Sequence, residues 1–130
     1  MEIGSVIERK DDRNMEYTRL GNSDIEVSRL CAGCMSFGNP ASKMHPWTLN
    51  AQESETIIKH ALDLGINFFD TANCYSAGTS EEYLSRAIKN NAARDKVVLA
   101  TKVYFNDGKL SKEAIPREVE GSLKRLGTEP

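Results

Sequence analysis

The stretch INFFDTANCY, residues 66–75, joins a short apolar run to a polar loop that holds an acid and a phenol. Its first five residues, 66–70, have the length and the residue types of a strand. Gly65 precedes this run and ends a helical stripe made of Ile57, Ile58, Ala61 and Leu62. Beyond the loop, a second helical face is made of Leu84, Ala87 and Ile88. The stretch is therefore predicted to be a strand that lies between two helices.

Two further strands are predicted on either side of this one. Residues 28–33, SRLCAG, form the first, and residues 96–102, KVVLATK, form a third with the near-continuous apolar run of a buried parallel strand. Ahead of them, residues 17–20 and 25–27 are strand-like runs around the turn sequence GNSD, which predicts a hairpin. Because helices connect the three later strands, those strands should be parallel with right-handed connections.

The ends of the predicted helices carry sequence signals of their own. Capping boxes, in which a polar N-cap is followed three residues later by Glu, are expected at Asn50 with Glu53 and at Thr79 with Glu82. The third helix has apolar residues at helical spacing between Ile115 and Leu126, and Gly127 is its expected stop. Pro116 would disrupt a helix that began at Ser111, so the regular helix is predicted to begin near Pro116 after a turn.

Composition restricts the class of protein. The chain has 130 residues, a formal net charge of −2 and 39% hydrophobic residues, which fits one globular domain and argues against a nucleic-acid binder. No apolar run approaches the roughly 18 residues of a membrane span, and residues 1–14 lack the apolar core of a secretory signal. These first residues are expected to form a flexible extension, and the three cysteines to be reduced thiols in a cytoplasmic protein. A complete (β/α)8 barrel needs about 250 residues, so this length allows only part of one.

Three side chains with useful chemistry follow the predicted strands. Asp70 ends the second strand, Tyr75 follows it by five residues, and Lys102 ends the third strand. Ligands of parallel α/β folds bind beyond the carboxyl ends of the strands, so an acid, a phenol and an amine should share one rim. The structural alternative is that each is an ordinary surface residue or loop anchor, and spacing alone does not separate the two interpretations.

Together at one rim, these groups would form a proton donor. An ammonium beside a phenol favours the phenolate and makes the phenol a stronger acid, and a carboxylate can hold the ammonium in place. Tyr75 would then be a general acid, Lys102 its activator and Asp70 the residue that positions Lys102. Such a donor suits protonation of a carbonyl oxygen as a hydride reaches the carbon. Because none of these side chains supplies a hydride, a nicotinamide cofactor would be needed.

Four segments resemble the aldo-keto reductase family in their order and spacing. Residues 65–82, which include GINFFDTANCYS and GTSEE, are similar to its second strand and the loop after it. Residues 98–102 are similar to its third strand, residues 122–128 to the end of its third helix, and residues 17–30 to its opening hairpin. The stretch GCMSFG, residues 33–38, is most similar to the bacterial oxidoreductase branch related to potassium-channel β subunits.

This resemblance implies both a fold and an activity. The fold is α/β, with residues 15–130 as the N-terminal portion of a (β/α)8 TIM barrel preceded by a β-hairpin. The activity is reduction of a small aldehyde or ketone with NADPH, and the family's catalytic residues match Asp70, Tyr75 and Lys102. Contacts to the cofactor are implied for Met35 and Asp70.

The resemblance also implies that part of the family's site is missing. Its fourth catalytic residue is a His at the end of the fourth strand, and the chain ends at Pro130 before that strand. Neither His45 nor His60 replaces it by position, so the chain alone is expected to have little activity. Self-association through open barrel edges is expected, and a non-catalytic interaction protein derived from the same family is the alternative function.

Other patterns are weaker. Cys31 and Cys34 form a C-x-x-C pair, but residues three apart on a strand face opposite sides, so a shared metal is not expected. A receiver-like signalling domain has a similar length, but it would need an acidic pair after the first strand, where the chain reads CAGC. Phe37 and Trp47 could either line a substrate pocket or cover an edge of the core.

Overall fold

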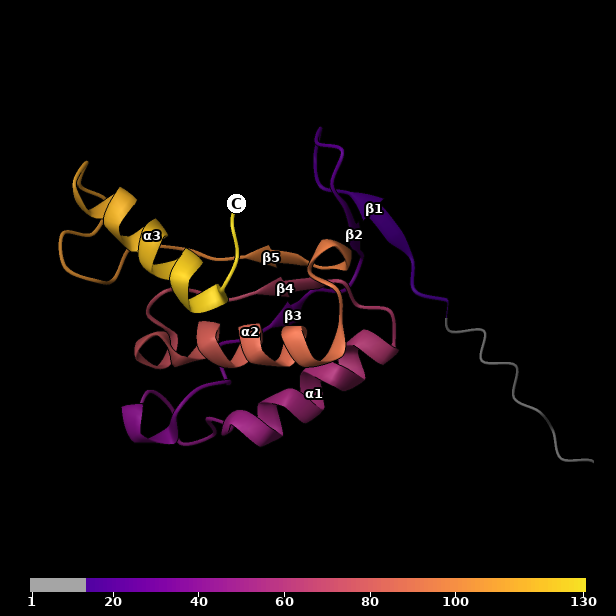
Figure 1. The fold of residues 1–130 in the computed structure, drawn as a ribbon, viewed down its shortest axis with the longest axis horizontal. Helices are drawn as coiled ribbons and strands as arrows, with labels where there is room; N and C mark the ends of the chain where they lie inside the picture. The colour runs from indigo at the N-terminus through magenta and orange to yellow at the C-terminus, as the bar shows by residue number, and fades with distance from the viewer. Residues whose placement is uncertain (1–13) are drawn as a thin grey trace, which may run out of the picture.

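A short parallel sheet lies at the centre of the computed structural model, which describes residues 14–130 (Figure 1). Its strands are β3 (Ala32–Gly33), β4 (Phe68–Asp70) and β5 (Val98–Ala100), in the order β3-β4-β5. In this register Gly33, Asp70 and Ala100 lie side by side, so the carboxyl ends of the three strands form one edge. The predicted parallel strands are therefore confirmed. The extension predicted for residues 1–14 lies, except for Asn14, outside the described residues.

The predicted hairpin is also confirmed. Strand β1 (Tyr17–Arg19) pairs antiparallel with β2 (Glu26–Ser28). The prediction of one strand over residues 28–33 was wrong, because Ser28 belongs to the hairpin and only Ala32–Gly33 pairs with β4. The side chain of Ser28 donates a hydrogen bond of 2.6 Å to the Leu30 carbonyl, which turns the chain between the two strands.

The other two strands are shorter than predicted. Strand β4 begins two residues late, and β5 begins two residues late and ends at Ala100, so Lys102 follows this strand by two residues instead of ending it. A 3-10 turn, η3 (Arg94–Lys96), precedes β5, and the Arg94 guanidinium holds it by a hydrogen bond of 2.8 Å to the Val97 carbonyl. Just before β4, the backbone N–H of Asn67 donates to the hydroxyl of Ser28 in β2 (3.2 Å) and not to a backbone carbonyl of β3. Side-chain hydrogen bonds at the amino edge of the sheet therefore replace part of the backbone ladder.

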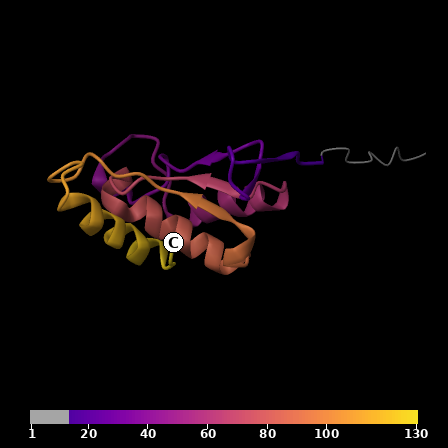
Figure 2. The ribbon, with the colours of Figure 1, turned by 90° about the horizontal axis from the view of Figure 1, so that it is seen from above.

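Helices α1 (Ala51–Asp63), α2 (Thr79–Asn91) and α3 (Ala114–Leu126) follow the strands in turn and lie to one side of the sheet (Figure 2). The capping box predicted at the start of α1 is confirmed. The Asn50 side chain accepts from the backbone N–H groups of Gln52 and Glu53 at 3.0 Å each, and the Glu53 carboxylate accepts from the Asn50 backbone at 3.0 Å.

The capping box predicted for α2 was wrong. The residue before α2 is Gly78, with φ of 93°, and it provides no side-chain cap. Thr79 is the first residue of the helix, and its hydroxyl donates to the Ser76 carbonyl (2.7 Å) and accepts from the backbone N–H of Asn39 (2.7 Å). A tertiary contact with a distant loop therefore takes the hydroxyl that the local pattern assigned to capping.

Helix α3 begins two residues before the predicted position. Pro116 is its third residue, where a backbone N–H has no partner within the helix, so the proline costs no hydrogen bond there. The Ser111 hydroxyl accepts from the backbone of Ala114 at 3.2 Å and forms the turn that precedes the helix. Gly127, with φ of 62°, ends α3 as predicted.

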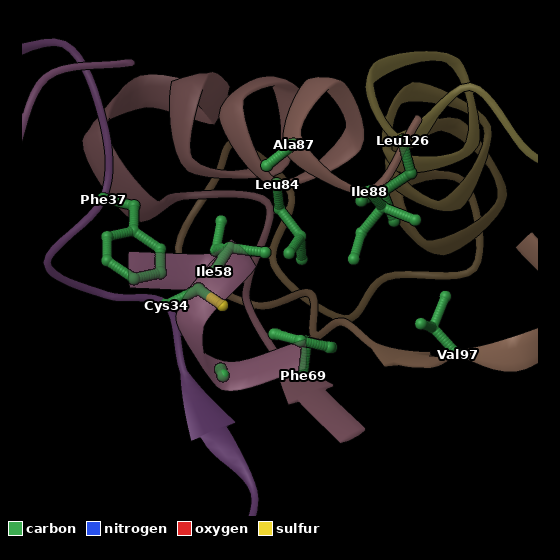
Figure 3. Close-up of a cluster of buried hydrophobic side chains, with 10 residues drawn as sticks. Cys34, Phe37, Ile58, Phe69, Leu84, Ala87, Ile88, Val97 and Leu126 are labelled. Atoms are coloured by element: carbon green, nitrogen blue, oxygen red, sulfur yellow. The ribbon is translucent and has the colours of Figure 1, made fainter. Parts of the chain in front are cut away.

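The core lies between the sheet and the helices (Figure 3). Phe69 at the middle of β4 is fully buried, and it packs in one cluster with Ile58 of α1 and Leu84 of α2. Phe37 also belongs to this cluster. Of the two roles predicted for it, it therefore covers the core and does not line a substrate pocket. Successive residues of a strand face opposite sides, so burial of Phe69 turns the Asp70 side chain to the other face of the sheet.

Each helix in residues 14–130 that packs on the sheet has 13 residues. None of the helices described there has the length and apolar character needed to cross a bilayer.

Candidate active site

Three predicted site residues come together beyond the carboxyl ends of β4 and β5. The Lys102 ammonium lies 2.6 Å from Oδ2 of Asp70 and 2.7 Å from the carbonyl oxygen of Thr71. It also lies 5.0 Å from the centroid of the Tyr75 ring, which is within cation–π range. An acid, an amine and a phenol therefore share one small area of the rim.

The backbone fixes this arrangement by extending the β4–β5 ladder past both strands. The N–H of Thr71 donates to the Ala100 carbonyl (2.8 Å), and the N–H of Asn73 donates to the Lys102 carbonyl (3.0 Å). These bonds hold Lys102 opposite the loop that leads to Tyr75. The apolar sequence of β5 favours its burial in the sheet up to Ala100, and the rim begins directly after this residue.

The charges at the rim favour an ionised lysine. Partial burial alone would lower the pKa of Lys102, but its contacts with Asp70 and the Tyr75 hydroxyl favour the ammonium and raise that pKa above its usual value. The side chains of Lys102 and Asp70 remain 49% and 39% exposed. A ligand could therefore reach the charged pair without displacing the fold.

The segment that carries Tyr75 has an unusual backbone. A short 3-10 helix, η2 (Tyr75–Gly78), contains Ser76 with φ of 47° and Ala77 with φ of 56°, so two non-glycine residues are left-handed. Such conformations cost on the order of 1–3 kcal/mol each and persist only where the surroundings hold them. The Ser76 backbone N–H donates to the sulfur of Met44, and the Thr79 hydroxyl holds the Ser76 carbonyl.

Gly38 allows the same segment to pack closely. A Cβ atom at Gly38 would overlap the side chain of Ser76, whereas a Cβ atom at Gly33 would meet nothing within 4 Å. Gly38→Ala should therefore displace the segment after Tyr75 and lower the free energy of unfolding by about 1–3 kcal/mol, the usual range for overpacking. Urea denaturation and the backbone amide shifts of residues 75–79 measure both effects. Gly33→Ala is the matched control, and equal losses in the two variants would contradict the close approach.

Met35, the residue expected at the cofactor, follows β3 by two positions. It lies at the same edge of the sheet as Asp70, and 40% of its surface is exposed. Cys34 beside it is fully buried, and burial raises the pKa of its thiol to about 12. Cys31 is exposed, so the two cysteines of the pair differ in environment. In residues 14–130 no group of His, Cys, Asp or Glu is arranged to hold a metal ion.

A buried carboxylate beneath the rim was not predicted from the sequence. Glu81 of α2 is fully buried, and its two oxygens accept from the Thr101 hydroxyl (2.6 Å) and from Nε of Arg125 (2.5 Å). The pair links α2 and α3 to the residue that precedes Lys102. The sequence does contain a sign that Glu81 is buried. Glu81 lies three residues before Leu84 and seven before Ile88, which places it on the apolar face of its helix.

Two hollows differ in their relation to the rim. One of about 570 Å³ is lined by residues such as Leu30 and Leu64, which precede β3 and β4, so it lies at the amino edge of the sheet. Another of about 220 Å³ is lined by Tyr75, Lys102 and Tyr104 among others. The smaller hollow is the candidate ligand site, because the titratable side chains border it. Trp47 is 57% exposed, and its ring stacks on that of His45 with 4.6 Å between the centroids. It is not among the residues that line either hollow.

The chain is similar in sequence to known aldo/keto reductases. The family model described as Aldo/keto reductase family matches residues 29–130. The chain is 39% identical to versiconal hemiacetal acetate reductase of Aspergillus parasiticus, a match that covers 88% of this chain and 40% of the relative. It is 43% identical to the uncharacterized oxidoreductase YrpG of Bacillus subtilis, over 88% of this chain and 37% of the relative. The chain thus spans about two fifths of the length of these curated relatives.

Solved structures give the same result for the fold. The holo form of aldo-keto reductase AKR11C1 from Bacillus halodurans superposes with a TM-score of 0.71 and 36% identity, covering 88% of this chain and 37% of that one. The thermostable aldo-keto reductase Tm1743 superposes with a TM-score of 0.72 and 28% identity over the same share of this chain and 39% of its own. The predicted fold, an α/β portion of a (β/α)8 barrel preceded by a hairpin, is confirmed. With a family model that covers most of its length, the chain belongs to the aldo/keto reductase family.

Proposed function

We propose that this chain forms the proton-donating part of an NADPH-dependent reductase that converts an aldehyde or ketone to an alcohol. The observation that carries the proposal is the Lys102 ammonium, which lies 2.6 Å from Asp70 and 5.0 Å from the Tyr75 ring centroid. Reduction of a carbonyl needs a proton at oxygen, and these three groups are the ones that a phenolic proton donor requires.

Each residue has a distinct role in this proposal. Tyr75 donates its hydroxyl proton to the carbonyl oxygen of the substrate, and the O–H bond of the alcohol forms as the phenol O–H bond breaks. Lys102 stabilises the negative charge that remains on the Tyr75 oxygen. Asp70 keeps the ammonium charged and in place through the 2.6 Å contact. When bound, the dihydronicotinamide supplies the hydride that reaches the carbonyl carbon.

The rim residues fit such a cofactor in two respects. Among them, no side chain is a hydride donor, so their chemistry is complete only with an external one. Met35 and Asp70 lie at one edge of the sheet with 40% and 39% of their surfaces exposed, so both are open to a bound ring. These two residues would hold the nicotinamide end of NADPH.

The ion pair at the rim makes a testable difference to Lys102. Its pKa should lie above the ordinary lysine value of about 10.4, and Asp70→Asn should lower it, because the partner that favours the ammonium is lost. Because the folded pKa is raised, the contribution of this ion pair to stability is present at neutral pH and is lost as the pH rises through that pKa.

An NMR titration of reductively ¹³C-methylated lysines measures the Lys102 midpoint directly. Asp63→Asn is the matched control, because it removes the carboxylate that contacts Lys59 at 2.7 Å and leaves the rim untouched. A Lys102 midpoint that does not change in Asp70→Asn would contradict the role given to Asp70.

We also propose that the 130-residue polypeptide alone turns over slowly. The two histidines in residues 14–130 lie in the loop before α1 and within α1, so neither provides a second donor at the rim. Loss of one such donor costs about 10²–10³-fold in rate. Fluorescence titration with NADPH and an assay of 4-nitrobenzaldehyde reduction test this, and micromolar binding with steady turnover from a monomer would overturn it.

Self-association and a cytoplasmic location complete the proposal. Phe105 is 77% exposed and Leu110 is 55% exposed, which favours association between chains and keeps a non-catalytic interaction role as the second candidate. The three cysteines are free thiols, and proteins of reducing compartments keep their thiols in this state. Sedimentation of the purified chain measures its association, and a role in interaction would require a stable oligomer without turnover.

A further inference from the structure

One carboxylate joins the two loops that carry the rim residues. Glu118 lies on α3, and its Oε2 accepts from Nδ2 of Asn73 (2.8 Å) and from Nδ2 of Asn106 (2.8 Å). Its Oε1 accepts from Nε and Nη2 of Arg117, both at 3.1 Å. Four donors therefore converge on a side chain that is only 14% exposed.

The two asparagines belong to the loops that position the proposed proton donor. Asn73 lies between Asp70 and Tyr75, and it is 2% exposed. Its backbone N–H also donates to the Lys102 carbonyl at 3.0 Å. Asn106 lies four residues after Lys102, in the loop that leads to α3. Glu118 thus connects the Tyr75 loop and the Lys102 loop to the same helix.

The carboxylate suits this position better than a neutral amide would. An ionised carboxylate only accepts hydrogen bonds, and all the groups that face Glu118 are donors. Hydrogen bonds from Asn106, Arg117 and Asn73 hold the pKa of Glu118 below its usual value, so the side chain is charged at neutral pH. Arg117 also donates to the Asp107 carbonyl, so the cation that faces Glu118 anchors the same loop.

We infer that Glu118 is a positioning residue that keeps Tyr75 and Lys102 together by holding Asn73 and Asn106 on one carboxylate oxygen. This inference rests on the proposed function, in which Tyr75 donates a proton and Lys102 stabilises the charge left on the Tyr75 oxygen. The distance between the two side chains, however, is measurable without turnover.

The test is an NOE experiment on the 130-residue chain with ¹³C-labelled lysine and tyrosine. Cross-peaks between the Lys102 ε-methylene and the Tyr75 ring are expected in the parent and are assigned by their absence in Lys102→Arg. Glu118→Gln should lower their intensity, because the neutral amide offers one acceptor oxygen to four donors and lacks the charge that strengthens the bonds from the two asparagines. Glu120→Gln is the matched control: Glu120 lies on the same helix, pairs with Lys124 at 2.9 Å and is 68% exposed, so this variant should retain the cross-peaks.

Two further variants keep the test decisive. If Glu118→Gln does not fold by circular dichroism, Asn106→Ala removes one donor from a partly exposed loop and should weaken the same cross-peaks. The double variant Glu118→Gln with Asn106→Asp restores a carboxylate–amide contact with the roles exchanged, and part of the intensity should return. Full intensity in folded Glu118→Gln, or an equal loss in Glu120→Gln, would overturn the inference.

The inference and the proposed function fail in different ways. A weaker NOE in Glu118→Gln, together with full turnover of Tyr75→Phe in a complete reductase chimera that contains residues 14–130, would support the positioning role of Glu118 and reject Tyr75 as the proton donor. A full NOE in Glu118→Gln, together with loss of turnover in Tyr75→Phe, would reject the positioning role of Glu118 and support Tyr75 as the proton donor.

Discussion

Replacing Tyr75 with phenylalanine should lower carbonyl turnover by about 10²–10⁴-fold, the usual contribution of a positioned general acid. The substitution removes the hydroxyl group that donates the proton and keeps the ring, whose centroid lies 5.0 Å from the Lys102 ammonium. The cleanest background is a chimera in which the described part of this chain replaces the aligned part of the Bacillus halodurans reductase, with which it shares 36% identity.

A matched control lies in the same hollow. Tyr104 borders it with Tyr75 and is 43% exposed, so Tyr104→Phe removes a phenolic hydroxyl from the same surroundings. Turnover of this control should stay within a few-fold of the parent chimera, and NADPH binding should be nearly unchanged in both variants. If Tyr75→Phe lost NADPH binding but retained turnover, the hydroxyl would serve to bind the cofactor and not to donate the proton.

The parts of the fold that were predicted correctly are those set by local physics. Asn50 and Glu53 form their capping box because all of its hydrogen bonds lie within four residues. Gly127 ends α3 because a left-handed φ of 62° is accessible to glycine without strain. The rim was also predictable, since parallel strands place their carboxyl ends at one edge whatever the exact strand lengths.

The predictions that failed involve contacts between distant segments. Thr79 has the pattern of an N-cap, but its hydroxyl bonds to Ser76 and to the backbone of Asn39, forty residues away. Ser28 was predicted to belong to the first parallel strand. Instead, it exchanges two hydrogen bonds with Asn67, the residue that precedes β4, and it remains in the hairpin. Local propensity gives no information on which distant group will compete for a donor or acceptor.

Arg125→Met should be strongly destabilising although it leaves the apolar core intact. Glu81 is fully buried, and without Arg125 its charge would keep only the Thr101 hydroxyl as a partner. Breaking a buried pair by removing one partner typically costs about 3–5 kcal/mol, because an uncompensated charge remains inside. That loss is a large fraction of the roughly 5–15 kcal/mol by which a domain is stable, so urea denaturation should show a much lower midpoint.

The neighbouring position provides the control for Arg125. Lys124→Met also removes a cation from α3, but Lys124 is 74% exposed and pairs with an exposed Glu120, so its loss should change the free energy of unfolding by less than about 1 kcal/mol. Adding Glu81→Gln to Arg125→Met should recover part of the stability, because the buried charge is gone and an amide oxygen can still accept from Thr101. If Arg125→Met were no more costly than Lys124→Met, the buried pair would not hold α3 against α2 and β5. In that case the bonds of the backbone ladder, and not the Glu81–Arg125 pair, would fix Thr101 and with it the start of the Lys102 loop.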